Sequence, residues 1–164
     1  MVFLVVFFCA EQFKEIGLLK PFVQVNHSMT RKKGAVRGMH YQNIPYAETK
    51  LVTCVKGEVA DIAIDIREGS KTFLNYHLTV LSDTNLKSLY IPEGFAHGFQ
   101  ALTKDCQLLY MHSEFYTPFS EGAIHPMDPS IKIQWPSEIT EISARDRNHK
   151  FIDHTFKGVG FYEL

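Results

Sequence analysis

Short stretches in which apolar and polar residues alternate run through most of this chain. Alternation with a period of two puts successive side chains on opposite faces of a β-strand. In residues 58–66 the alternation gives one apolar face and leaves Asp61 and Asp65 on the other. The pattern predicts strands in residues 22–28, 51–55, 58–66, 76–81, 89–91, 98–102 and 107–112.

Turn residues separate these strands, and no long helical pattern lies between them. Lys56-Gly57 and Glu68-Gly69-Ser70 are typical of tight turns. Many short strands joined by turns favour an antiparallel sandwich or barrel. We therefore expect an all-β protein in which residues 1–164 form a single domain.

The two ends of the chain differ from this middle part. Residues 1–10 are almost entirely apolar and predict a buried strand paired with other strands, either of this chain or of a second subunit. Residues 11–20 carry a short helical pattern that Gly17 would end. Residues 137–147 follow a proline-rich, loop-like stretch and predict a short helix or an extended tail.

Composition and charge exclude several classes of protein. Seventeen basic and eighteen acidic residues give a net charge of −1, so no basic field indicates a nucleic-acid partner. The apolar start is too short to cross a membrane and lacks the flanks of a signal peptide. Three cysteines without C-x-x-C spacing favour buried thiols in a reducing compartment, which predicts a cytoplasmic protein.

Two histidine segments stand out as candidate chemistry. Arg37-Gly38-Met39-His40-Tyr41-Gln42 is echoed by Ile91-Pro92-Glu93-Gly94-Phe95-Ala96-His97-Gly98-Phe99. They resemble the two metal-binding motifs of the cupin barrel, G-x-H-x-H-x(3–4)-E-x(6)-G and P-x-G-x-x-H. Gln42, however, stands at the second histidine, and Lys50 stands at the glutamate. An ammonium has no lone pair to give a metal, so we expect no metal site and no cofactor here.

The residues that replace the metal ligands suit proton transfer at carbon. A histidine can act as a general base, a lysine can stabilise developing negative charge, and a tyrosine can act as an acid. His40, Lys50 and Tyr110 form such a set. It would remove a proton next to a carbonyl group, hold the enolate oxygen and return a proton to the other face.

The chain resembles the dTDP-4-dehydrorhamnose 3,5-epimerases, cupin-fold enzymes of rhamnose and deoxysugar biosynthesis. The resemblance covers roughly residues 8–148. It is carried, in order and with consistent spacing, by residues 22–28, 34–42, 50–57, 65–70, 89–99, 109–116, 128–129 and 133–136. It implies a cupin-type antiparallel β-barrel (jelly roll) with short peripheral helices, isomerase activity on a nucleotide-linked 4-keto-6-deoxyhexose, and a homodimer.

The resemblance also implies roles for single residues. His40 corresponds to the base, and Asp146 to the carboxylate paired with it. Lys50 would lie near the sugar 4-keto oxygen, Tyr110 would be the acid on the opposite face, and Arg37 would bind the pyrophosphate. Further substrate-binding positions are Gln24, Asn26, Asp61, His97 and Tyr116.

Three alternatives and one departure from the family remain open. The chain could be a nucleotide-sugar ketoisomerase, an epimerase acting at a single carbon, or a sugar-binding cupin without turnover. Family members carry a further N-terminal segment with a D-x-R-G-x-F motif that contributes to nucleotide binding across the dimer. That motif does not occur in this sequence. We expect its lack to affect nucleotide affinity rather than the proton chemistry.

Overall fold

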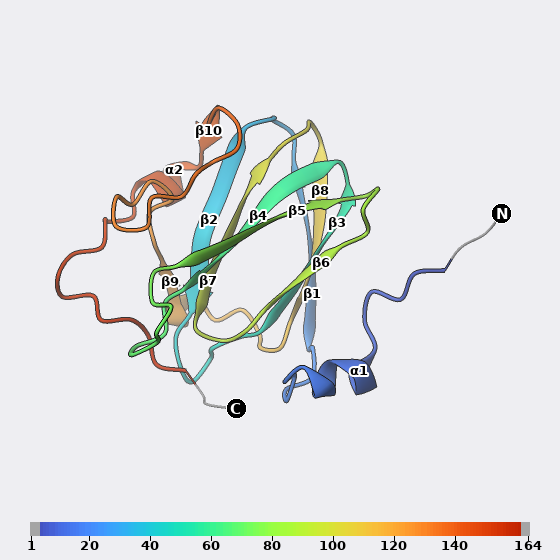
Figure 1. Cartoon of the computed structure of the whole chain (residues 1–164), viewed down its shortest axis with the longest axis horizontal. Helices are drawn as coiled ribbons and strands as arrows, with labels where there is room; N and C mark the ends of the chain where they lie inside the picture. The colour runs from blue at the N-terminus through green and yellow to red at the C-terminus, as the bar shows by residue number, and fades with distance from the viewer. Residues whose placement is uncertain (1–3, 162–164) are drawn as a thin grey trace.

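Two β-sheets face each other and enclose one core, as Figure 1 shows, and all strand pairs except the short parallel pair of β10 with β2 are antiparallel. The computed structural model describes residues 4–161. The first sheet has the strand order β1-β8-β3-β6, and the second has the order β10-β2-β7-β4-β5, with β9 pairing with β2. The predicted all-β antiparallel fold with short peripheral helices is confirmed.

The strand bounds follow the predicted segments closely, but the strands at residues 35–42, 121–123 and 141–142 were not predicted. The first sheet contains β1 (Gln24–Thr30), β8 (Cys106–His112), β3 (Lys50–Lys56) and β6 (Ser88–Ile91). The second contains β2 (Ala35–Gln42), β7 (Phe95–Ala101), β4 (Glu58–Asp65), β5 (Tyr76–Ser82), β9 (Glu121–Ala123) and β10 (Glu141–Ile142). The other elements are α1 (Ala10–Glu15), the 3₁₀ turn η1 (Pro118–Ser120) and α2 (Ala144–Arg147).

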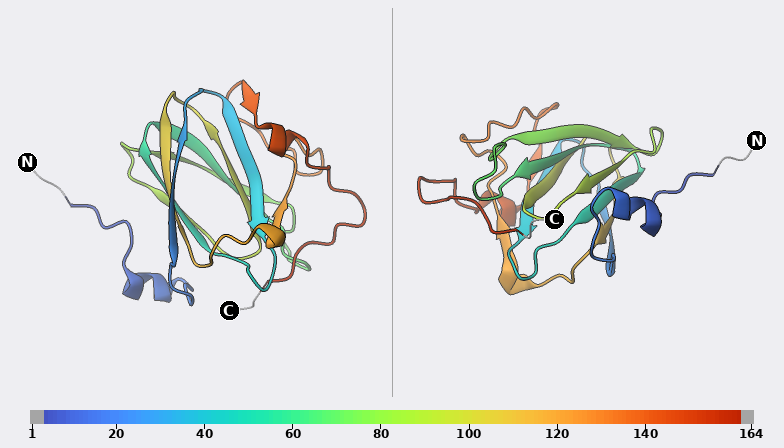
Figure 2. Two further views of the ribbon diagram at one scale, coloured as in Figure 1. Left: turned by 180° about the vertical axis from the view of Figure 1, so that it is seen from behind. Right: turned by 60° about the horizontal axis from the view of Figure 1, so that its bottom comes forward.

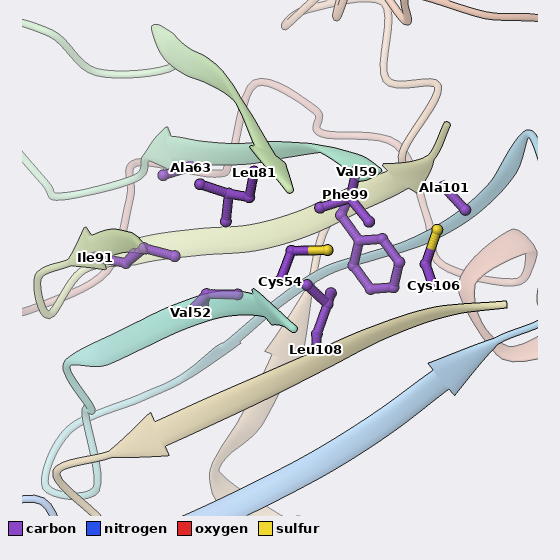
Figure 3. Packing of buried hydrophobic residues seen from close by; sticks show 10 residues of the cluster. All are labelled: Val52, Cys54, Val59, Ala63, Leu81, Ile91, Phe99, Ala101, Cys106 and Leu108. Atoms are coloured by element: carbon purple, nitrogen blue, oxygen red, sulfur yellow. The ribbon is translucent and has the colours of Figure 1, made fainter. Parts of the chain in front are cut away.

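Apolar side chains from both sheets fill the space between them (Figure 3). Phe99 of β7 packs there with Val52 and Cys54 of β3 and Leu108 of β8. Burial raises the pKa of the Cys54 thiol to about 11, so this cysteine stays a neutral core residue. The core fills one part of the interior and leaves the remainder for polar side chains.

The strand β4 is buried on both of its faces, which differs from the simple alternation in its sequence. Ile62 and Ile64 point outward, where they pack under Ile124, Ile131 and other residues of the C-terminal part of the chain. The opposite face was predicted to be polar because it carries Asp61, yet Asp61 is fully buried. A charged side chain inside a barrel requires a hydrogen-bond partner, and the partner of Asp61 lies in the site described below.

The N-terminal apolar segment is a correction to the sequence prediction. Residues 4–9 form no strand, and Leu4 and Val6 are largely exposed. The segment runs away from the barrel in both views of Figure 2. Residues 1–3 of the predicted strand lie outside the described residues. The helix predicted in residues 11–20 is present as α1, and the left-handed Gly17 follows its end.

Two glycines allow β2 and β7 to approach each other unusually closely. Gly38 has a φ of +118°, and a Cβ atom there would lie 2.6 Å from the Cα of Gly98. A Cβ atom at Gly98 would lie 2.5 Å from the carbonyl oxygen of Arg37. The register between the two strands shifts at this point, between Arg37 and His40. The close contact between Gly38 and Gly98 fixes the position of β2, the strand that carries Arg37 and His40.

Candidate active site

A cavity of about 670 Å³ opens between the two sheets at the polar end of the barrel interior. Its walls come from β1, β2, β3, β7 and β8, together with the segment that follows β8. Seven of the predicted site residues line it: Asn26, Arg37, His40, Lys50, His97, Tyr110 and Tyr116. The other three, Gln24, Asp61 and Asp146, contact residues of this lining.

Strand pairing places the polar residues of the first sheet in rows on its inner face. Gln24 of β1 and Lys50 of β3 are both register partners of His112, which lies between them on β8. In the next inward-facing row, Asn26 is the partner of Tyr110. Side chains opposite each other on neighbouring strands are close enough to interact directly. Residues far apart in the sequence therefore form one wall of the cavity.

His40 on β2 forms a charge-assisted pair with Asp146. Its Nε2 atom lies 2.7 Å from Asp146 Oδ1, while the backbone N–H of Gly38 donates to Oδ2 at 3.2 Å. Ser143 caps α2 by accepting from the Asp146 N–H, which holds the aspartate in place. Burial opposes ionisation of Asp146, but the hydrogen bonds outweigh it and lower its pKa.

This arrangement sets the tautomer of His40. An ionised Asp146 only accepts hydrogen bonds, so His40 Nε2 must carry the proton that it donates. The other ring nitrogen, Nδ1, is then free of a proton and available as a base. The His40 side chain is 30% exposed, so a substrate in the cavity can reach it.

A second histidine lies beside this pair. His149 Nε2 is 3.9 Å from Asp146 Oδ1, and the rings of His40 and His149 meet edge to face. Among the described residues, His40, Asp146 and His149 are the one group whose ligand atoms all lie close enough to hold a metal ion. Of these three residues only His40 lies in the cupin-like motifs, and Asp146 and His149 lie outside them.

The position where a metal-binding cupin carries a second histidine has a structural role here. Gln42 donates to the carbonyl oxygens of Tyr46 and Phe115 and accepts from the N–H of Thr117. These bonds hold the segment that follows β8 against β2. Gln42 is therefore fully engaged with the backbone, as its replacement of a metal ligand suggests.

Lys50 is held by Glu48, a residue that was not predicted to belong to the site. Its Nζ lies 3.1 Å from Glu48 Oε1, and Glu48 Oε2 lies 2.7 Å from His112 Nδ1. All three side chains are nearly buried. Burial opposes ionisation of Glu48, but Lys50 and His112 outweigh it and lower its pKa. The cavity wall thus carries an ammonium tied to an anion.

Tyr110 reaches the cavity from β8 as a protonated phenol. Burial is the largest cause of the raised pKa of this tyrosine, and the hydrogen bond of 3.0 Å with Ser28 only partly opposes it. Its ring meets His97 edge to face and stacks on His112. A phenol that keeps its proton at neutral pH is suited to donate it.

His97 faces the cavity with Asp61 behind it. His97 Nε2 lies 2.9 Å from Asp61 Oδ1, and both residues are buried. The aspartate found on the inner face of β4 therefore orients a histidine rather than lining the cavity itself. The other oxygen, Asp61 Oδ2, is buried without a hydrogen-bond partner among the described residues.

Arginine–glutamate pairs stand at the rim. Arg37 forms a short ion pair with Glu141 of β10, and Arg145 of α2 forms one with Glu121 of β9. The hydroxyl of Tyr116 also donates to Glu121, at 3.0 Å. The guanidinium groups are exposed enough to exchange these carboxylates for another anion.

The acidic partners were not predicted from the sequence. Glu48, Glu121 and Glu141 give no motif of their own, and His112 ends an ordinary apolar strand. A signal did exist for one of them. Glu48 lies two residues before Lys50, and the period of a strand puts such a pair on one face.

The fold and the cavity together define a class of protein. An antiparallel barrel whose cavity brings a His–Asp pair, a lysine and a protonated tyrosine together is a cupin-type acid–base enzyme. The family model described as dTDP-4-dehydrorhamnose 3,5-epimerase matches residues 2–154, and the chain belongs to this family. The predicted family, cupin-type fold and isomerase activity are confirmed.

Relatives with this activity cover most of the chain. The dTDP-4-dehydrorhamnose 3,5-epimerase of Shigella flexneri is 46% identical over 139 residues, which are 84% of this chain and 76% of that protein. The dTDP-4-dehydrorhamnose 3-epimerase of Streptomyces niveus is 38% identical over 133 residues, 81% of this chain and 64% of that protein.

A solved structure is similar over nearly the whole fold. The dTDP-6-deoxy-D-glucose-3,5-epimerase of Legionella pneumophila, in complex with dTDP-4-keto-L-rhamnose, matches with a TM-score of 0.86 and 38% identity. The match covers 96% of this chain and 84% of that one. Within residues 4–161, no helix is long and apolar enough to cross a membrane.

Proposed function

We propose that this enzyme epimerises C3, C5 or both in a dTDP-linked 4-keto-6-deoxyhexose, in the biosynthesis of rhamnose or a related deoxysugar. The observation that carries the proposal is the His40–Asp146 pair facing the same cavity as Lys50 and Tyr110. The 4-keto group makes the protons on C3 and C5 acidic. Epimerisation then needs only a base, an oxyanion partner and an acid.

His40 is the base in this proposal. Nδ1 takes the proton from the carbon, and the imidazolium that forms is stabilised by Asp146 at 2.7 Å from Nε2. A positioned general base supplies a rate factor of about 10²–10⁴. The depressed pKa of Asp146 keeps it ionised at neutral pH, as this role requires.

Lys50 and Tyr110 complete the reaction. The Lys50 ammonium stabilises the enolate oxygen that forms from the 4-keto group. Tyr110 then donates its phenolic proton to the carbon from the other face, which inverts the centre. When Ser28 donates its own proton to the phenolic oxygen, the Tyr110 proton is free for this step. The proton returns from the imidazolium and solvent between turnovers.

The rim residues hold the nucleotide part in this proposal. Arg37 exchanges Glu141 for the diphosphate, whose oxygens match the guanidinium fork. Gln24, Asn26 and Tyr116 supply hydrogen bonds at the mouth, and His97 lines the sugar pocket with Asp61 behind it. The proposed reaction uses no metal or cofactor, and His40 and Asp146 serve proton transfer.

Deuterium exchange tests the proposal directly. Incubation with dTDP-4-keto-6-deoxyglucose in D₂O should place deuterium on C3, C5 or both, read by NMR and mass spectrometry. The position and number of deuterium atoms separate a 3,5-epimerase from an epimerase acting only at C3, the activity named for the Streptomyces niveus relative. Binding of the nucleotide sugar without any exchange would overturn the proposal and support a binding protein without turnover.

We further propose that two copies of the chain pack through the outer face of the first sheet. Exposed apolar side chains gather there, on β1, β8, β3 and just before β1: Val23, Val25, Met29, Val55 and Leu109. Apolar patches of this kind are rare on proteins that remain single copies, and a second sheet can cover one face to face. The exposed residues Leu4 and Val6 would find a cover in the same assembly.

Light scattering after gel filtration tests the homodimer. The wild-type protein should elute at twice the chain mass, and Met29→Glu with Leu109→Glu should give single copies. Phe119→Glu changes an exposed apolar residue off this sheet and should leave the dimer intact. A wild-type protein that stays at the mass of one chain would overturn this arrangement.

The three cysteines form no disulfide, which supports the cytoplasmic location that such biosynthesis implies.

A further inference from the structure

A chain of hydrogen bonds crosses the first sheet from the cavity rim to Lys50. The backbone N–H of Tyr116 donates to Gln24 Oε1 at 3.1 Å, and Gln24 Nε2 donates to Asn26 Oδ1 at 3.0 Å. Asn26 Nδ2 lies 3.3 Å from His112 Nε2, and His112 Nδ1 lies 2.7 Å from Glu48 Oε2. Glu48 Oε1 then meets the Lys50 ammonium at 3.1 Å.

One group at the start fixes the direction of every bond. A backbone N–H can only donate, so Gln24 must turn its oxygen to Tyr116 and its NH₂ group to Asn26. Asn26 must then accept with its oxygen and donate with its NH₂ group. His112 Nε2 therefore accepts, and the His112 proton lies on Nδ1, which donates to Glu48.

The other end of the chain agrees with this direction. Lys50 has three protons and no acceptor, so Glu48 must accept from it as well as from His112. An ionised carboxylate satisfies both demands, and the lowered pKa of Glu48 is consistent with that state. The Tyr116 N–H at one end and the Lys50 ammonium at the other can only donate. They therefore leave a single pattern of donors and acceptors for the whole series of hydrogen bonds.

The same contacts fix where the ammonium lies. Lys50 is attached through a long flexible side chain, and charged side chains of this kind lose much rotamer freedom when they are ordered. Besides Glu48, its Nζ contacts the carbonyl oxygen of His40 at 3.4 Å. Glu48 is itself held by His112, whose ring stacks on Tyr110. The glutamate thus ties the ammonium to a rigid wall.

We propose that Glu48 and His112 are positioning residues that hold the Lys50 ammonium for the enolate oxygen through this directed hydrogen-bond chain. The inference rests on the proposed epimerase function and adds two residues to it. Neither residue needs to touch the substrate. Their effect passes through Lys50 and falls on the step in which negative charge develops.

Three variants test the chain. Glu48→Gln keeps the shape but offers one acceptor where two donors arrive, so it cannot satisfy both Lys50 and His112. His112→Phe keeps the ring that stacks on Tyr110 and removes the donor to Glu48. His112→Asn keeps a donor near the Nδ1 position. Glu68→Gln, on an exposed turn, is the control for loss of one carboxylate.

The expected results separate positioning from substrate contact. Removal of groups that orient a charged catalytic partner costs about 10–100-fold in activity in metal sites, and we expect about tenfold in kcat for Glu48→Gln and His112→Phe. KM should change less than about twofold, and His112→Asn should recover most of kcat. The control should match the wild-type protein.

The pH profile gives a second readout. In Glu48→Gln the alkaline limb of the kcat profile should shift relative to the wild-type profile, because a neutral amide replaces the ionised carboxylate beside the Lys50 ammonium. The titratable groups that face this set are Tyr110 on β8, His97 on β7 and His40 on β2. Since all three remain in the variant, a shifted limb reports the lost carboxylate.

Each outcome supports or overturns the inference. Wild-type turnover with unchanged kcat and pH profile in the Glu48 and His112 variants would overturn it and leave the epimerase proposal standing. A higher KM at constant kcat would also overturn it, because it would indicate that Glu48 binds substrate directly. Absence of deuterium exchange in the wild-type protein would instead refute the proposed function. If Glu48→Gln fails to fold, the two His112 variants decide alone.

Discussion

Replacement of Asp146 by asparagine should inactivate the enzyme through the wrong tautomer of His40. Gly38 N–H donates to one oxygen of Asp146 at 3.2 Å, and His40 Nε2 meets the other at 2.7 Å. An asparagine offers one acceptor and one donor. Because the Gly38 N–H can only donate, the amide oxygen must face it and the NH₂ group must face His40.

This exchange moves the proton on the imidazole. His40 Nε2 would have to accept from the asparagine, so the proton would lie on Nδ1, the nitrogen assigned as the base. Loss of a positioned general base costs about 10²–10⁴ in rate, and we expect kcat to fall about 10³-fold, or ~4 kcal/mol of transition-state stabilisation. KM should stay close to its wild-type value, since Asp146 does not line the cavity.

The assay is the rate of deuterium incorporation into dTDP-4-keto-6-deoxyglucose, followed by NMR in D₂O. Asp153→Asn is the matched control, because Asp153 is exposed and accepts only from residues close to it in the chain. Circular dichroism and the thermal midpoint show whether both variants are folded. A folded Asp146→Asn protein within about tenfold of the wild-type kcat would refute the tautomer argument.

Three other predictions follow from the same structure. Tyr110→Phe should keep deuterium exchange on the base side within about tenfold but lower formation of the inverted product at least 100-fold, measured by NMR, since general acids contribute about 10²–10⁴. The pKa of Glu48 is lowered in the folded state, so its stabilising contribution is present above about 4.5 and lost as the pH falls through the lower folded value. Urea unfolding at a series of pH values should show this loss, and Glu48→Gln should flatten it. Gly38→Ala should yield little folded protein because its Cβ would meet Gly98 Cα at 2.6 Å, whereas Gly69→Ala, with open space around it, should cost only ~1–2 kcal/mol of unfolding free energy for its positive φ. Equal effects of the two alanine variants on the thermal midpoint would contradict the close-contact argument.

Period-two alternation was sufficient to predict the fold class and every strand of four or more residues except β2. Each of these strands turns one face toward the core, so every second residue along it is apolar. The elements β9 and β10 were missed because three and two residues are too few to show a period. The apolar residues 4–9 were misread as a buried strand because apolar character alone does not supply a pairing partner within the chain.

The site was predictable where residue type alone carries the chemistry. His40, Lys50 and Tyr110 were found because base, cation and phenol are the groups that carbon-acid chemistry needs. Glu48 and His112 were missed because their importance comes from strand register and tautomer, which depend on contacts between distant segments. Register cannot be read from one strand, so these partners became visible only in the folded protein.

The pairing of His40 with a carboxylate 106 residues further along the chain has a consequence for biosynthesis of the protein itself. Strands β1 to β8 precede Asp146 in the order of translation, so the barrel and its cavity can be made before the carboxylate emerges. During that interval the histidine has no anion to hold its proton on Nε2. In the proposed mechanism, a nascent chain therefore lacks a base of fixed tautomer until the C-terminal segment docks.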